Sequence, residues 1–119
     1  MRLIYKLLSV TTLIAALLGG FAIAAGADVA RGRQLAHDVM KGNCLACHQI
    51  PADPRAVTAA TIGPPLIGMR VRFPDSDRLR RQISDPIAAN PNTVMPPFGR
   101  HRILEEDEID AIIDYLYTQ

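Results

Sequence analysis

Apolar residues recur at helical spacing near both ends of the chain. The first stripe follows Asp28, a candidate N-cap, and predicts a helix ending at Gly42-Asn43; its members are Gly32, Leu35, Ala36 and Val39. The second stripe predicts a C-terminal helix and consists of Ile109, Ile112, Ile113 and Leu116. Because glycine weakens a helix, Gly32 indicates either the close approach of another helix or a tolerated surface position. We expect the two terminal helices to cross at Gly32.

Start and stop signals define the remaining elements. Leu104 can pack on the C-terminal helix as a hydrophobic staple, and Glu108 stands where a capping box needs it, although Glu105 is a poor N-cap. A short helix is predicted to start at Asp75 or Ser76 and to end at Pro86. Residues 51–65 and 90–99 are rich in proline, glycine and asparagine and are predicted loops. No segment alternates like a strand, so the predicted fold class is all-α.

The first 27 residues have the pattern of a secretory signal peptide. A basic start with Arg2 and Lys6 precedes an apolar run, and Ala25-Gly26-Ala27 is a small-residue cleavage site. Cleavage after Ala24 is an alternative that shifts the mature start by about three residues, and a retained membrane anchor is another. We therefore expect a signal peptide at 1–27, one domain at 28–119, and a periplasmic location with no membrane segment in the mature form.

Composition limits what this domain can do. Its 92 residues make a small core on their own, which favours a bound group at the centre. Without Arg2 and Lys6 the basic count falls from 13 to 11 against 12 acidic residues, so the formal charge becomes −1 and argues against a nucleic-acid role. Five arginines cluster between residues 70 and 81, and six acidic residues lie between 105 and 114. Both runs suit either solvated faces or, for the arginines, contacts with a partner or with carboxylates.

The two cysteines carry the most specific chemistry. Cys44-Leu45-Ala46-Cys47-His48 has the Cys-x-x-Cys-His spacing of c-type haem attachment, with two thiols for thioethers and an imidazole for the iron. A structural zinc site would need about four ligands, and a thioredoxin-like pair should lie near a βαβ pattern that is absent here. A plain dithiol or a disulfide remains an alternative. The motif predicts one covalent haem c, with His48 as an axial ligand.

The opposite axial position has several candidates. Met95 is favoured because it lies far along the chain from His48, in a loop stiffened by Pro96 and Pro97. His101, Met69, His37 and an open site are the alternatives, while Met40 and Met69 are both interpreted as core residues. On the proximal side, the second ring N–H of His48 is expected to donate to the Pro64 carbonyl, unless Gly63-Pro64-Pro65 is an ordinary turn.

The attachment motif, Gly63-Pro64-Pro65-Leu66, Met95 and the two terminal helices, in this order, resemble class I cytochromes c over nearly all of the mature chain. The resemblance implies an all-α fold around one covalently attached haem. It maps the haem-attaching cysteines to Cys44 and Cys47, the iron ligands to His48 and Met95, and the carbonyl acceptor to Pro64. Leu66 and Phe98 are further candidate haem contacts in the matching loops.

Residues 42–48, 63–66, 70–74 and above all 90–99, Asn-Pro-Asn-Thr-Val-Met-Pro-Pro-Phe-Gly, together resemble the SoxX family of small cytochrome subunits in sulfur oxidation. That resemblance implies a heterodimer with a larger SoxA-like haem subunit, which acts as an L-cysteine S-thiosulfotransferase and couples thiosulfate to a cysteine of a SoxYZ-like carrier. This chain would be its non-catalytic electron-transfer subunit and would pass electrons to a downstream cytochrome. A free-standing monohaem electron carrier is the alternative, and a gas-binding cytochrome requires that Met95 is not a ligand.

Overall fold

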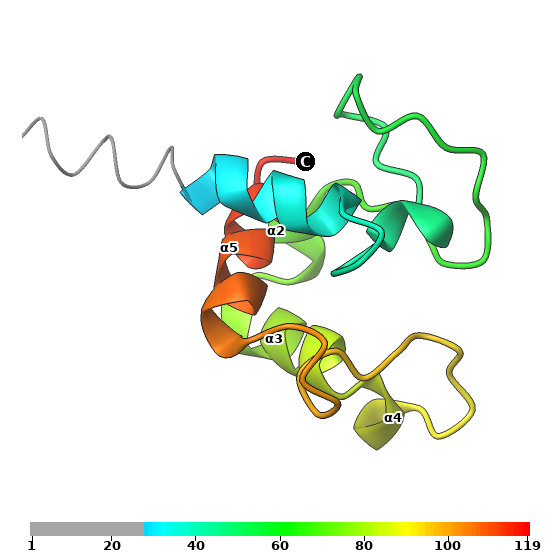
Figure 1. The fold of residues 1–119 in the computed structure, drawn as a ribbon, viewed down its shortest axis with the longest axis vertical. Helices are drawn as coiled ribbons and strands as arrows, with labels where there is room; N and C mark the ends of the chain where they lie inside the picture. Colours follow the sequence, from blue (N-terminus) through cyan, green and yellow to red (C-terminus); the bar gives the residue numbers. More distant parts are fainter. Residues whose placement is uncertain (1–27) are drawn as a thin grey trace, which may run out of the picture.

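The computed structural model describes residues 28–119, so the expected signal peptide and its cleavage site lie outside the described residues. The described part is helical and contains no strand, which confirms the all-helical prediction (Figure 1). A first helix covers residues 28–37. It is followed by η1 (Cys44–Ala46), α2 (Met69–Arg72), α3 (Ser76–Ser84), α4 (Pro86–Ala89) and α5 (Glu106–Leu116).

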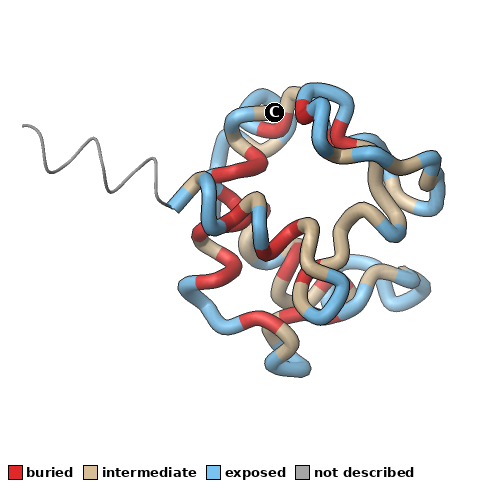
Figure 2. Tube along the Cα trace, turned by 45° about the horizontal axis from the view of Figure 1, so that its top comes forward, coloured by how far each residue is buried: buried red, intermediate tan, exposed pale blue. Residues whose placement is uncertain are grey.

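Helix α5 carries six of the fifteen buried hydrophobic residues of the described part. Its inner face carries Ile109, Ile112, Ile113, Tyr115 and Leu116, and Figure 2 shows buried stretches on this helix and on the segments beside it. The predicted capping glutamate is in place, because the Glu105 backbone N–H donates to Glu108 Oε2 at 3.0 Å. Lys41 also pairs with Glu108, at 2.9 Å, which ties the start of α5 to the turn after the first helix.

The first helix packs closely on α5 at Gly32. A Cβ at this position would lie 1.8 Å from Ala111 O, so only glycine lets the two backbones approach this far. Arg31 and Asp107 form an exposed ion pair at 2.7 Å beside this contact. In Figure 1 the cyan first helix lies against the orange-red α5.

The first helix ends earlier than predicted. It stops at residue 37, where the sequence pattern extended it to Gly42-Asn43. The Asp38 carboxylate accepts a hydrogen bond from the Met40 backbone N–H at 2.8 Å, and this local pairing competes with helix continuation. The interpretation of Met40 as core is therefore wrong, since the turn leaves this side chain 83% exposed.

The middle of the chain holds two short helices that the sequence did not reveal. Asp75 caps α3 as expected, since its carboxylate accepts from the Asp77 N–H at 2.9 Å. Helix α3 ends at Ser84, just before Pro86 as predicted, and Pro86 then opens α4, where its missing N–H is not needed for a hydrogen bond within the helix. Helix α2 follows Gly68, whose φ of 61° favours glycine, and the Gly68 N–H donates to Gln119 O at 3.0 Å. The C-terminus thereby anchors α2.

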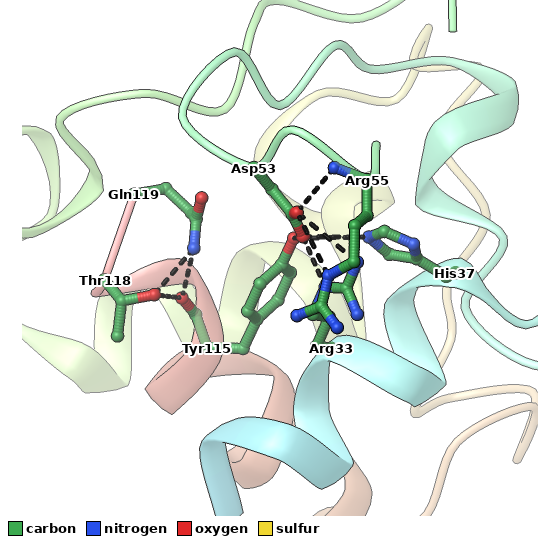
Figure 3. Close-up of polar contacts among 7 residues, drawn as sticks. All are labelled: Arg33, His37, Asp53, Arg55, Tyr115, Thr118 and Gln119. Carbon is green, nitrogen blue, oxygen red and sulfur yellow. Dashed lines mark hydrogen bonds and ion pairs between the residues drawn. The ribbon is translucent and has the colours of Figure 1, made fainter. Parts of the chain in front are cut away.

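A buried carboxylate joins three separate segments (Figure 3). Asp53 is 8% exposed and lies on the loop after the cysteine motif. Arg33 of the first helix donates to it at 2.5 Å, and the Tyr115 hydroxyl of α5 donates at 2.7 Å. His37 Nε2 lies 3.5 Å from the same carboxylate and 3.2 Å from the Tyr115 hydroxyl oxygen. The Arg33 guanidinium and the Tyr115 hydroxyl hold the pKa of Asp53 well below its usual range.

Candidate functional site

A largely apolar cavity of about 510 Å³ lies between the cysteine motif, α3, α5 and the 90–98 loop. Cavities of about 300–1,000 Å³ are typical of small-molecule and cofactor sites. All the site residues expected from the sequence line it: Cys44, Cys47, His48, Pro64, Leu66, Met95 and Phe98. The structure thus brings together two loops that are far apart along the chain.

The cysteine motif begins with a single 3-10 turn. Asn43 adopts a left-handed conformation with φ 45°, and the His48 N–H donates to Cys44 O at 2.8 Å. Both cysteines are free and half-buried. Burial raises the pKa of the Cys44 thiol to about 11, so this thiol is protonated at neutral pH. A reactive thiolate at Cys44 is therefore disfavoured.

The loop containing Gly63-Pro64-Pro65 is bonded to the motif. Its backbone donates from Gly63 N to Cys47 O and from Leu66 N to Gln49 O, both at 2.8 Å. His48 Nδ1 lies 2.7 Å from Pro64 O, the geometry of an N–H to carbonyl hydrogen bond that leaves Nε2 free as a ligand. A Cβ on Gly63 would meet His48 Cε1 at 2.2 Å, so the imidazole packs directly on this glycine.

The Met95 loop is built by its own hydrogen bonds. The Thr93 N–H donates to Asn90 O at 3.0 Å, and the Met95 N–H donates to Thr93 Oγ1 at 3.1 Å. Just beyond the loop, the Phe98 N–H donates to Ile83 O of α3 at 3.2 Å. The half-buried Met95 thioether is therefore presented to the cavity on a segment with little freedom to move.

The alternative axial residues lie in different places. Met69 also lines the cavity and is 2% exposed, in keeping with its interpretation as a core residue. His37 and His101 are not among the lining residues; His37 faces Tyr115, and His101 is exposed. Within residues 28–119 no three His, Cys, Asp or Glu side chains gather in the arrangement of a metal site.

The side chains around the cavity fit a haem c. Two thiols at attachment spacing, an imidazole oriented by a carbonyl and a thioether all reach one apolar space. The sequence missed two residues here: Gly63 as the surface under the His48 ring, and Gln82 of α3, whose amide faces Met95. Neither carries a local signal, since each acts through a residue distant in sequence. No helix in the described range is both long and apolar enough to span a bilayer.

Two comparisons with known proteins bear on this site. Residues 27–116 match the family model described as cytochrome C oxidase, cbb3-type, subunit III. Over 77 residues the chain is 38% identical to an uncharacterized lipoprotein of Aquifex aeolicus (strain VF5). The aligned stretch is 65% of this chain and 36% of that relative, so the chain spans little more than a third of the relative's length.

Proposed function

The chain belongs to the cytochrome C oxidase, cbb3-type, subunit III family of c-type cytochrome domains, and from this premise we propose that it carries one covalent haem c on Cys44 and Cys47 and transfers electrons. A cytochrome c domain implies haem c and an electron-transfer role. The proposal of one covalent haem c is best supported by the cavity itself, which is lined by both thiols, His48 and Met95.

When bound, the haem supplies a one-electron Fe(III)/Fe(II) couple. The Pro64 carbonyl fixes the His48 ring and makes Nε2 a better donor. Met95 lines the same cavity and would hold the iron through its thioether, a donor that would favour the ferrous state and raise the reduction potential. Apolar side chains, among them Leu66 and Phe98, keep water from the site and strengthen this preference for the less charged state.

The fold and the location follow from the same proposal. The close contact of Gly32 with Ala111 supports a crossing of the two terminal helices, as a class I cytochrome c fold would have. The c-type cytochromes are typically exported, and the Aquifex relative is named a lipoprotein. We assign residues 1–27 to a signal peptide that directs the chain to the periplasm.

For the physiological reaction we propose the electron-transfer subunit of a SoxAX-like heterodimer. The larger subunit would join a thiol sulfur of a SoxYZ-like carrier to thiosulfate, forming an S–S bond and releasing one proton and two electrons. This chain would accept the electrons one at a time and pass them to a downstream cytochrome. The motif in residues 90–99 supports this assignment, and the same segment carries Met95 into the cavity.

A free-standing monohaem carrier is the second candidate, because every feature of the cavity suits it equally. Pull-down of the tagged protein from thiosulfate-grown cells, with haem staining of the eluate, distinguishes the two. A larger haem subunit and thiosulfate-dependent reduction in the presence of the carrier are expected for the heterodimer. A lone small haem band without that activity would refute the heterodimer and favour the carrier.

We propose that the arginines of α2 form part of the surface on which the larger subunit docks. Arg70 stacks over the Tyr117 ring at 4.3 Å, and Arg72 donates to Pro65 O at 2.8 Å, yet both side chains remain exposed. Replacing both with glutamate is expected to weaken heterodimer affinity several-fold at low salt, because charges at an interface rim steer association. The control is Arg31→Glu, which makes the same replacement of arginine by glutamate at one position on the first helix. Unchanged affinity of the double variant would exclude this face.

Gly63→Ala tests the support under the proximal imidazole. The new methyl group would displace the His48 ring and weaken its bond to Pro64 O, so the ligand becomes less basic. We expect the reduction potential to rise by tens of millivolts, where about 59 mV is a tenfold change for one electron. Pro65→Ala, which leaves the Pro64 carbonyl in place, is the control. A potential equal to wild type would show that this packing has no role in tuning.

A further inference from the structure

His37 lies at the end of the first helix, in the cluster around Asp53 (Figure 3). Its Nε2 lies 3.2 Å from the Tyr115 hydroxyl oxygen. The one proton of that hydroxyl is donated to Asp53, and burial together with this bond raises the pKa of Tyr115, so the proton stays there. In neutral His37, Nε2 must therefore carry the proton that points to the Tyr115 oxygen, which leaves the lone pair on Nδ1. A further proton binds at Nδ1.

Polar and charged groups from three elements surround this imidazole. Asp53, on the loop after the cysteine motif, lies 3.5 Å from Nε2 and favours the protonated ring. Arg33 on the first helix and Arg55 on the loop oppose it, and Tyr115 of α5 is uncharged. Burial, with Arg33 as the next cause, lowers the pKa of His37 below its ordinary value of about 6.5. His37 is thus mainly neutral at pH 7 and gains a positive charge in acid solution, to which 20% of its side chain is exposed.

The end of the first helix is bonded to the turn that carries the cysteine motif. The Gly42 N–H donates to Leu35 O, two positions before His37, at 3.1 Å. A Cβ on Gly42 would lie 3.4 Å from Cys44 Sγ, which places this turn against the first attachment thiol. Ala36, the neighbour of His37 on the helix, is completely buried. A charge on His37 therefore acts on the cavity partly through packed protein, where it is screened less than in water.

We propose that His37 is a proton-linked group of this chain: a proton bound at its Nδ1 raises the reduction potential of the haem, so that an electron and a proton are taken up together in acid solution. This inference rests on the proposed function, in which the cavity holds the haem. The electron reduces ferric to ferrous iron, and the proton comes from water and binds the imidazole; oxidation releases both. A positive charge at His37 favours the ferrous state, because that state carries one positive charge fewer. Reduction must in turn strengthen proton binding at His37 by the same factor, since the coupling between two binding equilibria is reciprocal.

His37→Gln tests the proposal, because glutamine retains an N–H donor for the Tyr115 oxygen but cannot become charged. The measurement is the ratio of reduced to oxidised holoprotein at a fixed electrode potential, at about pH 5 and at about pH 8. We expect the ratio of wild type to exceed that of the variant about threefold at the acid pH and to equal it at the alkaline pH. His101→Gln, the same change at an exposed histidine, is the control and should behave as wild type at both. Equal ratios for wild type and His37→Gln at both pH values would overturn the proposal.

NMR titration of the wild-type holoprotein gives a second readout that needs no variant. The His37 ring should bind a proton about threefold more tightly in the reduced than in the oxidised protein, whereas the exposed His101 ring should show no such difference. Equal proton affinities of His37 in the two states would overturn its role while leaving haem binding and electron transfer in place. A purified protein that carries no haem would overturn the proposed function itself, and its intact mass distinguishes this failure from the first.

Discussion

Replacement of both Cys44 and Cys47 with alanine is expected to abolish covalent haem attachment completely. The two thiols are the only cysteine sulfurs in the chain, and both line the cavity. Haem staining of a denaturing gel should therefore be lost in the double variant, because no thioether can form. The single variants, Cys44→Ala and Cys47→Ala, are the matched controls, since each retains one thiol and should keep some haem on the denatured chain.

The same double variant should also lose its stable fold. Without the haem, the apolar side chains that line the cavity of about 510 Å³ lose their packing partner, and a domain of this size has only a small core of its own. We expect broad, weakly cooperative thermal unfolding measured by circular dichroism. Haem that remained with the denatured double variant, or a sharp unfolding transition without haem, would contradict this account.

Asp53→Ala is expected to destabilise the holoprotein by about 3 kcal/mol. The change leaves the partly buried Arg33 guanidinium and the Tyr115 hydroxyl without their acceptor, and removing one partner of a buried ion pair costs about 3–5 kcal/mol. The lower figure applies because 20% of the Arg33 side chain is still exposed to water. Chemical unfolding of wild type and variant measures the difference. Asp107→Asn breaks an exposed pair with Arg31 and should have little effect.

The effect of Asp53 should depend on pH in a defined direction. Its pKa is lower in the folded state than in the unfolded chain, so its contribution is complete above about pH 4 and is lost as the pH falls further. The stabilities of wild type and Asp53→Ala should therefore converge in acid. A constant difference down to the acid limit would mean that the ionised carboxylate is not the stabilising group.

The sequence predicted the features that repeat along one element. Helical spacing located α5, and Asp75 and Glu108 marked helix starts because capping depends on residues within one turn. The Cys-x-x-Cys-His spacing likewise pointed to the site, since the chemistry of attachment is local. Gly32 indicated a close contact with another helix, because glycine weakens a helix and is needed where another backbone approaches closely.

Features that depend on distant partners were not predictable from the sequence. Asp53 sits in a loop, and its partners Arg33 and Tyr115 are 20 and 62 residues away. Gln82 faces Met95 only because the chain returns to the end of α3. Met40 was misplaced because methionine commonly fills gaps in a core, whereas the turn after Asp38 leaves this residue exposed.

The most direct test of the central claim is the intact mass and visible spectrum of the denatured, purified protein exported from cells that attach haem c. The account predicts one haem per chain that stays bound after denaturation, linked to Cys44 and Cys47. A polypeptide of unmodified mass with two free thiols at these positions would contradict it.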